Sequence, residues 1–262
     1  MKSQNEVVIA MPIYNESEGI VEFLTEIQAA FSSLNLEFVL VNDASTDQTV
    51  IKVEEFIKST LTPVKLISNS TNLGHGPSTI RGIDAAIQTG RAIVMTVDGD
   101  GQFLGSDMRR LFNLHQESGY SVSEGIRTDR TDPLFRKLTT ALTRLLVFCR
   151  CHRMPKDANT PLRVYSRVDL ISIRNVLDAD LLTPNLHISA LVRDKKFGFK
   201  LGKLKVRSLP RRGINSTGTM WQSGKQLLPS KRFLGFAVKS FKQWLFTTRL
   251  RGVGESQSAL HG

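Results

Sequence analysis

Short apolar runs alternate with longer stretches of helical periodicity through the first half of the chain. The apolar runs predict four strands, at residues 7–11, 38–41, 64–67 and 93–97. Apolar residues at helical spacing predict helices at residues 17–33, 47–60 and 77–89, with Ser17 as a candidate cap for the first. Strands that alternate with helices indicate an α/β fold with a mostly parallel sheet flanked by helices.

The second half has a less regular pattern. It predicts helices at 134–148 and 186–196, a turn and helix at 164–176, and a strand at 203–207. Residues 231–251 predict a helix with aromatic and basic side chains. Because no linker interrupts the earlier part, we expect one domain over residues 1–228, followed by a basic amphipathic helix and tail at 229–262.

Polar clusters follow all four predicted strands of the first half. They read "PIYNESEG", "NDASTDQT", "NSTNLGHG" and "DGDGQ". In parallel sheets the carboxyl ends of the strands meet at one edge, and ligands bind there. The sequence therefore predicts a binding site that all four clusters share.

The pair Asp98 and Asp100, at the end of the fourth strand, is the sharpest chemical signal. Two neighbouring carboxylates repel each other unless a positive charge lies between them. A calcium loop is excluded because Phe103 and Arg109 stand where that loop needs glycine and glutamate. A dinucleotide fingerprint is disfavoured because Thr79 replaces its third glycine, and no Walker motif occurs. Oxygen ligands of this kind suit Mg²⁺ or Mn²⁺ bound together with substrate phosphates.

The four segments "MPIYNESEGI", "VNDASTDQT", "NLGHGPSTIRGIDAA" and "VDGDGQ" together resemble the family-2 glycosyltransferases, which have the GT-A fold. Within that family the chain is most similar to the polyprenyl-phosphate sugar transferases of the dolichol-phosphate mannose synthase group. The resemblance covers about the first 130 residues, and weaker similarity to the family continues to about Leu228. It implies an inverting transfer from a UDP- or GDP-linked sugar to a polyprenyl phosphate, with Mg²⁺ or Mn²⁺ as cofactor.

The resemblance also implies roles for individual residues. The residues that it places around the nucleotide are Pro12, Tyr14, Glu16, Asp43, Gly74 and Asp98. Among these, Asp43 would hold the base, and Gly74 would let the loop approach the nucleotide. The residues that it assigns to the metal are Asp98, Asp100 and Gln102, and the two that it assigns to an acceptor phosphate are Arg127 and Arg136. Asp98, Asp100, Arg127 and Arg136 are thus the expected catalytic set.

The chain departs from the family pattern in two places. Asn42 stands where the family often has the first of two adjacent acids, which affects nucleoside recognition. The later family segment survives only as "DANTPLR", in which Asp157 and Arg163 match. Recognition of the acceptor is therefore expected to differ from the family pattern.

Net charge is distributed unevenly. The chain of 262 residues has a net charge of +11, but residues 193–262 hold 16 Lys and Arg against two acids, while the other residues hold 19 against 22. A basic block of this kind indicates an anionic partner. The helix at 231–251 suits either an anionic bilayer surface or packing on the catalytic domain. With only two cysteines, a reducing compartment is expected, so we predict a cytoplasmic protein that is peripheral at the membrane.

Two alternatives remain open. A glycosyltransferase that acts on a hydroxyl of a glycan or lipid would need a general base, and the second half offers none in a convincing motif. A phosphate acceptor is already an anion and needs none. A basic nucleic-acid-binding protein would explain the positive block, but it lacks a recognisable binding signature and leaves the acidic strand ends unexplained.

Overall fold

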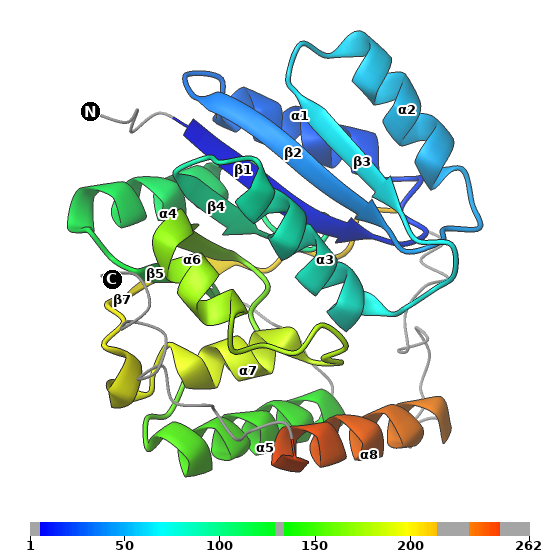
Figure 1. Cartoon of the computed structure of the whole chain (residues 1–262). Helices are drawn as coiled ribbons and strands as arrows, with labels where there is room; N and C mark the ends of the chain where they lie inside the picture. The colour runs from blue at the N-terminus through cyan, green and yellow to red at the C-terminus, as the bar shows by residue number, and fades with distance from the viewer. Residues whose placement is uncertain (1–5, 129–133, 214–230, 247–262) are drawn as a thin grey trace, which may run out of the picture.

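The chain folds around one seven-stranded sheet with helices on both faces (Figure 1). The computed structural model describes residues 6–128, 134–213 and 231–246. Strand order is β3-β2-β1-β4-β6-β5-β7, and β6 alone runs against the others in this sheet. The strands are β1 Glu6–Ile13, β2 Asn35–Asn42, β3 Val64–Ser68, β4 Ile93–Thr96, β5 Val122–Thr128, β6 Arg163–Ser166 and β7 Leu201–Arg207.

The helices lie on both faces of the sheet. They are α1 Ile20–Ala30, α2 Thr49–Ser59, α3 His75–Gln88, α4 Gly105–Ser118, α5 Leu134–Cys151, α6 Arg167–Arg174, α7 Pro184–Leu191 and α8 Lys231–Phe246, with a short 3-10 turn at Lys195–Phe197. Helices α1, α2 and α4 cover one face of the sheet and α3, α6 and α7 the other, each group over its own apolar cluster, while α5 and α8 pack outside α7 in a third, smaller cluster. In β1, Ile9 and Met11 face the cluster under α1, α2 and α4, whereas Val8 and Ala10 face the cluster under α3, α6 and α7. Alternation along a strand thus supplies both layers from one segment.

Sequence patterns predicted this fold correctly as far as β4 and only in part beyond it. All four predicted strands and three helices of the first half are present. Strand β5 and helix α4 were not predicted, and β6 was wrongly expected to be a turn before a helix. The reason is that β5 and β6 bury the polar residues Glu124 and Arg163, which disguise the apolar pattern of a strand. Ser17 does not cap α1, whose N-cap is Gly19.

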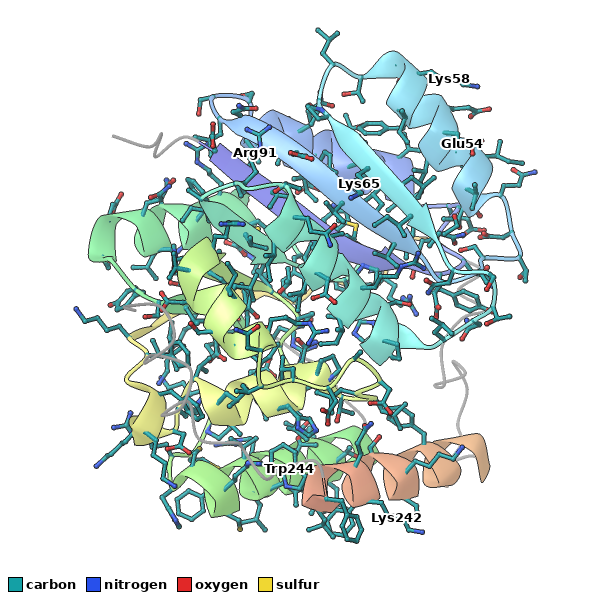
Figure 2. All side chains as sticks on the ribbon, viewed as in Figure 1. Glu54, Lys58, Lys65, Arg91, Lys242 and Trp244 are labelled. Carbon is teal, nitrogen blue, oxygen red and sulfur yellow. The ribbon has the colours of Figure 1, made fainter. Side chains whose placement is uncertain are left out.

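Helix α8 packs on α5 and α7 through Trp244 (Figure 2). Its Trp244 is buried in a small cluster with Val147 of α5 and Leu186 of α7. The Trp244 ring meets His187 edge-on at 4.9 Å between ring centroids, and the Arg150 guanidinium lies 5.0 Å from the Trp244 ring. Among the residues that the structure covers, none of the helices is both long and apolar enough to traverse a bilayer.

Candidate active site

The polar loops meet where the strand order reverses, between β1 and β4. The ends of the strands are joined by backbone hydrogen bonds: Gly99 N–H donates to the Pro12 carbonyl at 3.2 Å, and Asp43 N–H donates to the Ile13 carbonyl at 2.9 Å. A side chain at position 99 would have its Cβ only 2.6 Å from the Ile13 Cγ2, so glycine is needed there. Such a switch point at the carboxyl ends of strands is where α/β sheets bind ligands.

Three carboxylates converge at this point: Glu16 after β1, and Asp98 and Asp100 after β4. Burial raises the pKa of Glu16 to about 7, and the charges of Asp100 and Asp98 add to that effect although Arg211 opposes it. Burial and the charge of Asp98 raise the pKa of Asp100 to about 6. The cluster is therefore short of positive charge, which is the condition under which a site binds a cation.

A guanidinium and an imidazole lie against these carboxylates. Arg211 pairs with Glu16, and its Nε lies 3.6 Å from Asp100 Oδ2. On the other side, His75 Nε2 at the start of α3 lies 3.4 Å from Asp98 Oδ1. The carboxylates thus contact a guanidinium from the segment after β7 and an imidazole from the first turn of α3.

Arg212 fixes the segment that carries Arg211. Its guanidinium pairs with Glu22 at 2.7 Å and with Glu26, and lies 5.2 Å from the Phe23 ring of α1. Its backbone N–H donates to the Asp100 carbonyl at 3.1 Å. The residues after β7 are therefore bound to α1 and to the end of β4 at once.

Asp98 and Asp100 fit the predicted divalent cation in the chemistry of their donors. Both offer carboxylate oxygens, and Asp98 is partly exposed. Within the described residues no group of three or more His, Cys, Asp or Glu side chains forms a metal cage. In general, Mg²⁺ and Mn²⁺ bind through one or two carboxylates and complete their shell with water and substrate phosphates.

Gln102 links the end of β4 to the segment after β7. Its Nε2 donates to the Leu209 carbonyl at 3.2 Å, and its backbone N–H donates to Asp100 Oδ1 at 3.2 Å. The side-chain amide is thereby oriented toward Leu209, while the backbone of Gln102 holds the Asp100 carboxylate. Its predicted role as a metal ligand stays a prediction.

Asp43 anchors the loop that follows β3. Its carboxylate accepts from Leu73 N–H at 2.8 Å, from Gly74 N–H at 2.9 Å and from the Asn69 side chain at 2.8 Å. An ionised carboxylate has about four acceptor positions, so these bonds use most of them. Its predicted contact with a nucleoside base stays a prediction, and the bonds give Asp43 a clear positioning role as well.

The remaining predicted nucleotide residues lie on the same rim. Pro12 is the last residue but one of β1, and the half-buried Tyr14 directly follows that strand. Gly74 has φ +91° with open space where a Cβ would be, so its backbone conformation, rather than crowding, requires glycine. The structure therefore brings Pro12, Tyr14, Glu16 and Gly74 to one edge of the sheet.

Arg127, at the end of β5, is already paired. Its Nε and Nη2 donate to the two oxygens of Asp157 at 2.7 and 3.0 Å, and Nη2 also donates to the Asn159 carbonyl at 3.2 Å. The nearby charges of Asp157, Asp98 and Asp100 raise its pKa against the opposing effect of burial. Arg136 lies in the first turn of α5, and its side chain is outside the described part.

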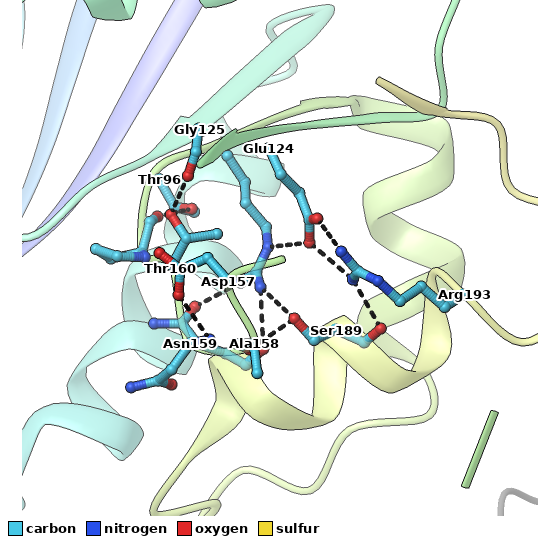
Figure 3. A network of polar contacts seen from close by, with 12 residues as sticks. Thr96, Glu124, Gly125, Asp157, Ala158, Asn159, Thr160, Ser189 and Arg193 are labelled. Carbon is cyan, nitrogen blue, oxygen red and sulfur yellow. Dashed lines mark hydrogen bonds and ion pairs between the residues drawn. The ribbon is translucent and has the colours of Figure 1, made fainter. Parts of the chain in front are cut away.

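A buried polar network holds the segment that carries Asp157, the partner of Arg127 (Figure 3). Glu124 accepts hydrogen bonds from Arg163 at 3.2 Å and from Arg193 at 3.1 Å. Ser189 of α7 accepts from Arg163 at 2.8 Å and donates to the Ala158 carbonyl at 2.7 Å. The segment that holds Asp157 is thus bound to Ser189 of α7, which in turn binds Arg163 of β6.

Sequence reasoning missed His75 and understated Arg211 and Asp157. His75 stands beside the predicted Gly74 in "GHG" at a strand end, and that place was the available signal. Arg211 lies more than one hundred residues from Asp100 in the chain. No local pattern could have paired them.

Comparison with known proteins shows the family of the chain and its fold. Residues 8–163 match the family model described as "Glycosyl transferase family 2". The chain belongs to glycosyl transferase family 2. This family-2 chain is 30% identical over 163 residues to an undecaprenyl-phosphate 4-deoxy-4-formamido-L-arabinose transferase of Pseudomonas fluorescens, covering 62% of the chain and 47% of that protein. The enzyme of the same name from Serratia proteamaculans is 24% identical over 204 residues, covering 74% and 61%.

The expected resemblance to polyprenyl-phosphate sugar transferases is therefore confirmed, although this family-2 chain spans about half the length of most curated relatives that it matches.

Solved structures confirm the GT-A fold. Glucosyl-3-phosphoglycerate synthase from Mycobacterium tuberculosis, in complex with Mn²⁺, UDP and glucosyl-3-phosphoglycerate, matches with a TM-score of 0.59 at 15% identity, over 93% of this chain and 80% of that one. S. aureus TarS 1-349 in complex with UDP-GlcNAc matches with a TM-score of 0.51 at 18% identity, over 82% and 61%. At these identities the likeness establishes the fold of the family-2 chain.

Proposed function

We propose that the chain is an inverting, metal-dependent glycosyltransferase that moves a sugar from a UDP- or GDP-linked donor to a polyprenyl phosphate. The observation that carries the proposal is the convergence of Glu16, Asp98 and Asp100 at the switch point of the sheet. Asp98 and Asp100 would hold Mg²⁺ or Mn²⁺, which neutralises the charge of a departing diphosphate when bound. The Mn²⁺ and UDP of the mycobacterial structure support the same chemistry.

The chain's own residues then position the two substrates. The loop held by Asp43, with His75 at its end, faces the donor side of the acidic cluster. Arg211 lies where a guanidinium would also grip a donor diphosphate. On the acceptor side, Asp157 binds Arg127 and so orients the Arg127 guanidinium group. Arg136 is proposed to complete the acceptor contacts.

The reaction that follows requires no strong base. An oxygen of the acceptor phosphate forms a bond to the anomeric carbon while the bond from that carbon to the diphosphate breaks on the opposite face. The acceptor is already an anion at neutral pH, so no proton needs to be removed from it. The names of the curated relatives support a polyprenyl phosphate in this role. The location that follows is the cytoplasmic face of a membrane, with the catalytic domain at 1–228 and the basic part at 229–262.

One experiment decides between this acceptor and a hydroxyl. A screen of UDP- and GDP-sugars identifies the donor, and the enzyme is then offered a short polyprenyl phosphate and the matching alcohol. We expect transfer to the phosphate with inverted anomeric configuration, measured by NMR, and its loss in excess chelator. Equal glycosylation of the alcohol would establish the hydroxyl alternative instead. Binding of DNA with a steep salt dependence, and of no nucleotide, would identify a nucleic-acid-binding protein.

A further inference from the structure

Exposed apolar side chains gather on two helices. Of the thirteen large apolar side chains that are exposed within the described residues, eight belong to α5 and α8. They are Leu138, Leu142, Leu145 and Phe148 of α5, and Val238, Phe241, Leu245 and Phe246 of α8. Scattered exposed apolar residues are ordinary, but a gathering of this kind on neighbouring elements marks an interaction surface.

The spacing of these residues produces a stripe along each helix. On α5, Leu138, Leu142 and Leu145 follow one another at four and three residues, which puts them on one face. Val238, Phe241 and Leu245 do the same on α8. We call these two stripes with their helices the α5–α8 platform. The platform lies at the end of the molecule farthest from α2 (Figure 1).

The opposite sides of both helices are anchored to the protein, so the stripes are not part of the core. Val147 of α5 and Trp244 of α8 are buried together in one small cluster. Figure 2 shows Trp244 on the side of α8 that faces α7, and Lys242 on the outer side. The described contacts therefore account for the inward faces and leave the stripes to the outside.

Charge decides which occupant suits the platform. The segments Leu134–Cys151 and Lys231–Phe246 contain eight Lys and Arg and no Asp or Glu. A second copy of the chain would bring two such basic surfaces together, and like charges would oppose that contact. Among the basic side chains that the structure describes on these helices, Lys137, Lys239 and Lys242 are exposed, whereas Arg144 donates to the Pro155 carbonyl and Arg150 lies against the Trp244 ring. Exposed apolar stripes on helices with exposed lysines and no acidic residue are typical of helices that lie in the surface of an anionic bilayer.

We infer that the α5–α8 platform docks on an anionic lipid bilayer, with both helices in the plane of the headgroups. The inference deepens the proposed function, and rests on it only where the acceptor is concerned. Arg136, proposed to bind the acceptor phosphate, lies on α5 itself. Docking would place the start of α5 where a polyprenyl phosphate emerges from the bilayer.

Vesicle binding tests the inference directly. The chain is sedimented with vesicles of phosphatidylcholine containing phosphatidylglycerol, and with phosphatidylcholine alone. We expect binding to the anionic vesicles that weakens with salt. The double variant Leu142→Glu and Phe241→Glu should lower the partition coefficient by about 100-fold or more, because two apolar side chains no longer enter the bilayer. A matched control, Ile51→Glu and Leu61→Glu, changes two exposed apolar residues at α2 and beyond it, and should bind like the parent.

A second platform variant keeps the test valid if the double glutamate variant does not fold. Lys239→Gln and Lys242→Gln keep the stripes and remove two exposed charges, and should lower binding by about 30-fold. Equal binding by the parent and both platform variants would overturn the inference. A dimer of the parent that the glutamate variant converts to monomer, or a lower melting temperature of that variant with unchanged vesicle binding, would overturn it in favour of a protein occupant.

The outcomes separate this inference from the proposed function. Binding of UDP with Mn²⁺, measured by calorimetry, should be the same in the parent and in the platform variants. A parent that binds UDP and Mn²⁺ but no vesicles overturns the platform and leaves the enzyme. A parent that binds anionic vesicles but transfers no sugar to any acceptor overturns the proposed function and leaves the platform.

Discussion

At the scale of single residues, the carboxylates after β4 carry the clearest expectation. Asp100 is buried beside Asp98, so its charge costs free energy unless a cation is bound. Asp100→Asn should weaken binding of UDP in the presence of Mn²⁺ by about tenfold or more and leave the melting temperature unchanged or higher. Calorimetry and thermal unfolding check both parts, with the exposed Glu117→Gln as control. A variant that binds UDP and Mn²⁺ normally would remove Asp100 from the metal site.

His187 gives a prediction for stability against pH. Burial, followed by the charge of Arg150, lowers its pKa from 6.5 to about 4, and burial lowers the pKa of His115 in the same way. At pH values between about 4 and 6.5, these histidines bind protons in the unfolded chain but not in the folded one. The free energy of unfolding should therefore fall by on the order of 3 kcal/mol for each histidine as the pH decreases from 7 to 4.

Replacement of His187 isolates its contribution to the pH dependence of the free energy of unfolding. Its Nε2 has no hydrogen-bond partner within the described residues, and its ring packs on Trp244. His187→Phe should keep that ring contact and show a smaller loss of stability at low pH, measured by denaturant unfolding at pH 7 and pH 4.5. An unchanged pH dependence would contradict this account.

The same scale shows what the sequence could and could not predict of the site. Asp98 and Asp100 were predictable because they directly follow a buried strand, and the ends of parallel strands share one edge. The pairing of Arg127 with Asp157 was not, because the family pattern assigns Arg127 to a substrate while burial here demands a protein partner. Ion pairs between distant segments leave no periodic signal in a sequence.

At the scale of elements, the start of α3 depends on its contact with the loop before α7. A Cβ added at Gly76 would lie 2.0 Å from the Leu181 carbonyl oxygen. Gly76→Ala should therefore displace this loop or the first turn of α3, with a loss of about 1–3 kcal/mol and weaker donor binding through His75. Gly235→Ala in α8 is the control, since its Cβ would enter open space. Unfolding and UDP titrations on both variants measure the difference.

Elements were predictable in proportion to the regularity of their burial. Strands β1, β2 and β4 are apolar on both faces, and short apolar runs identify them. Strand β5 reads "VSEGIRT" and buries Ser123 and Glu124, and β6 begins with the fully buried Arg163. Their polar groups satisfy one another through tertiary contacts, which cannot be inferred from local pattern.

At the scale of the whole molecule, the network around Glu124 joins β5 and β6 to α7. One carboxylate lies between the buried guanidinium groups of Arg163 and Arg193. Glu124→Gln should lower the free energy of unfolding by about 3–5 kcal/mol, because it leaves two buried positive charges without a negative partner. Denaturant unfolding tests this, and a loss below about 1 kcal/mol would mean that water or the carbonyl groups of α7 suffice.

Gln243 of α8 extends the α5–α8 platform toward the donor site. Its side chain accepts from Leu182 N–H at 2.8 Å and donates to the Asp180 carbonyl at 3.0 Å. The carbonyl groups of this loop lie so close to Gly76, which is next to His75, that a Cβ there would be 2.0 Å from the Leu181 oxygen. Two binding equilibria that share such a mechanical connection must be reciprocal. If anionic vesicles change the affinity of the protein for UDP by a given factor, UDP must change its affinity for vesicles by the same factor. We expect Gln243→Ala to weaken this coupling, so that both factors move toward one.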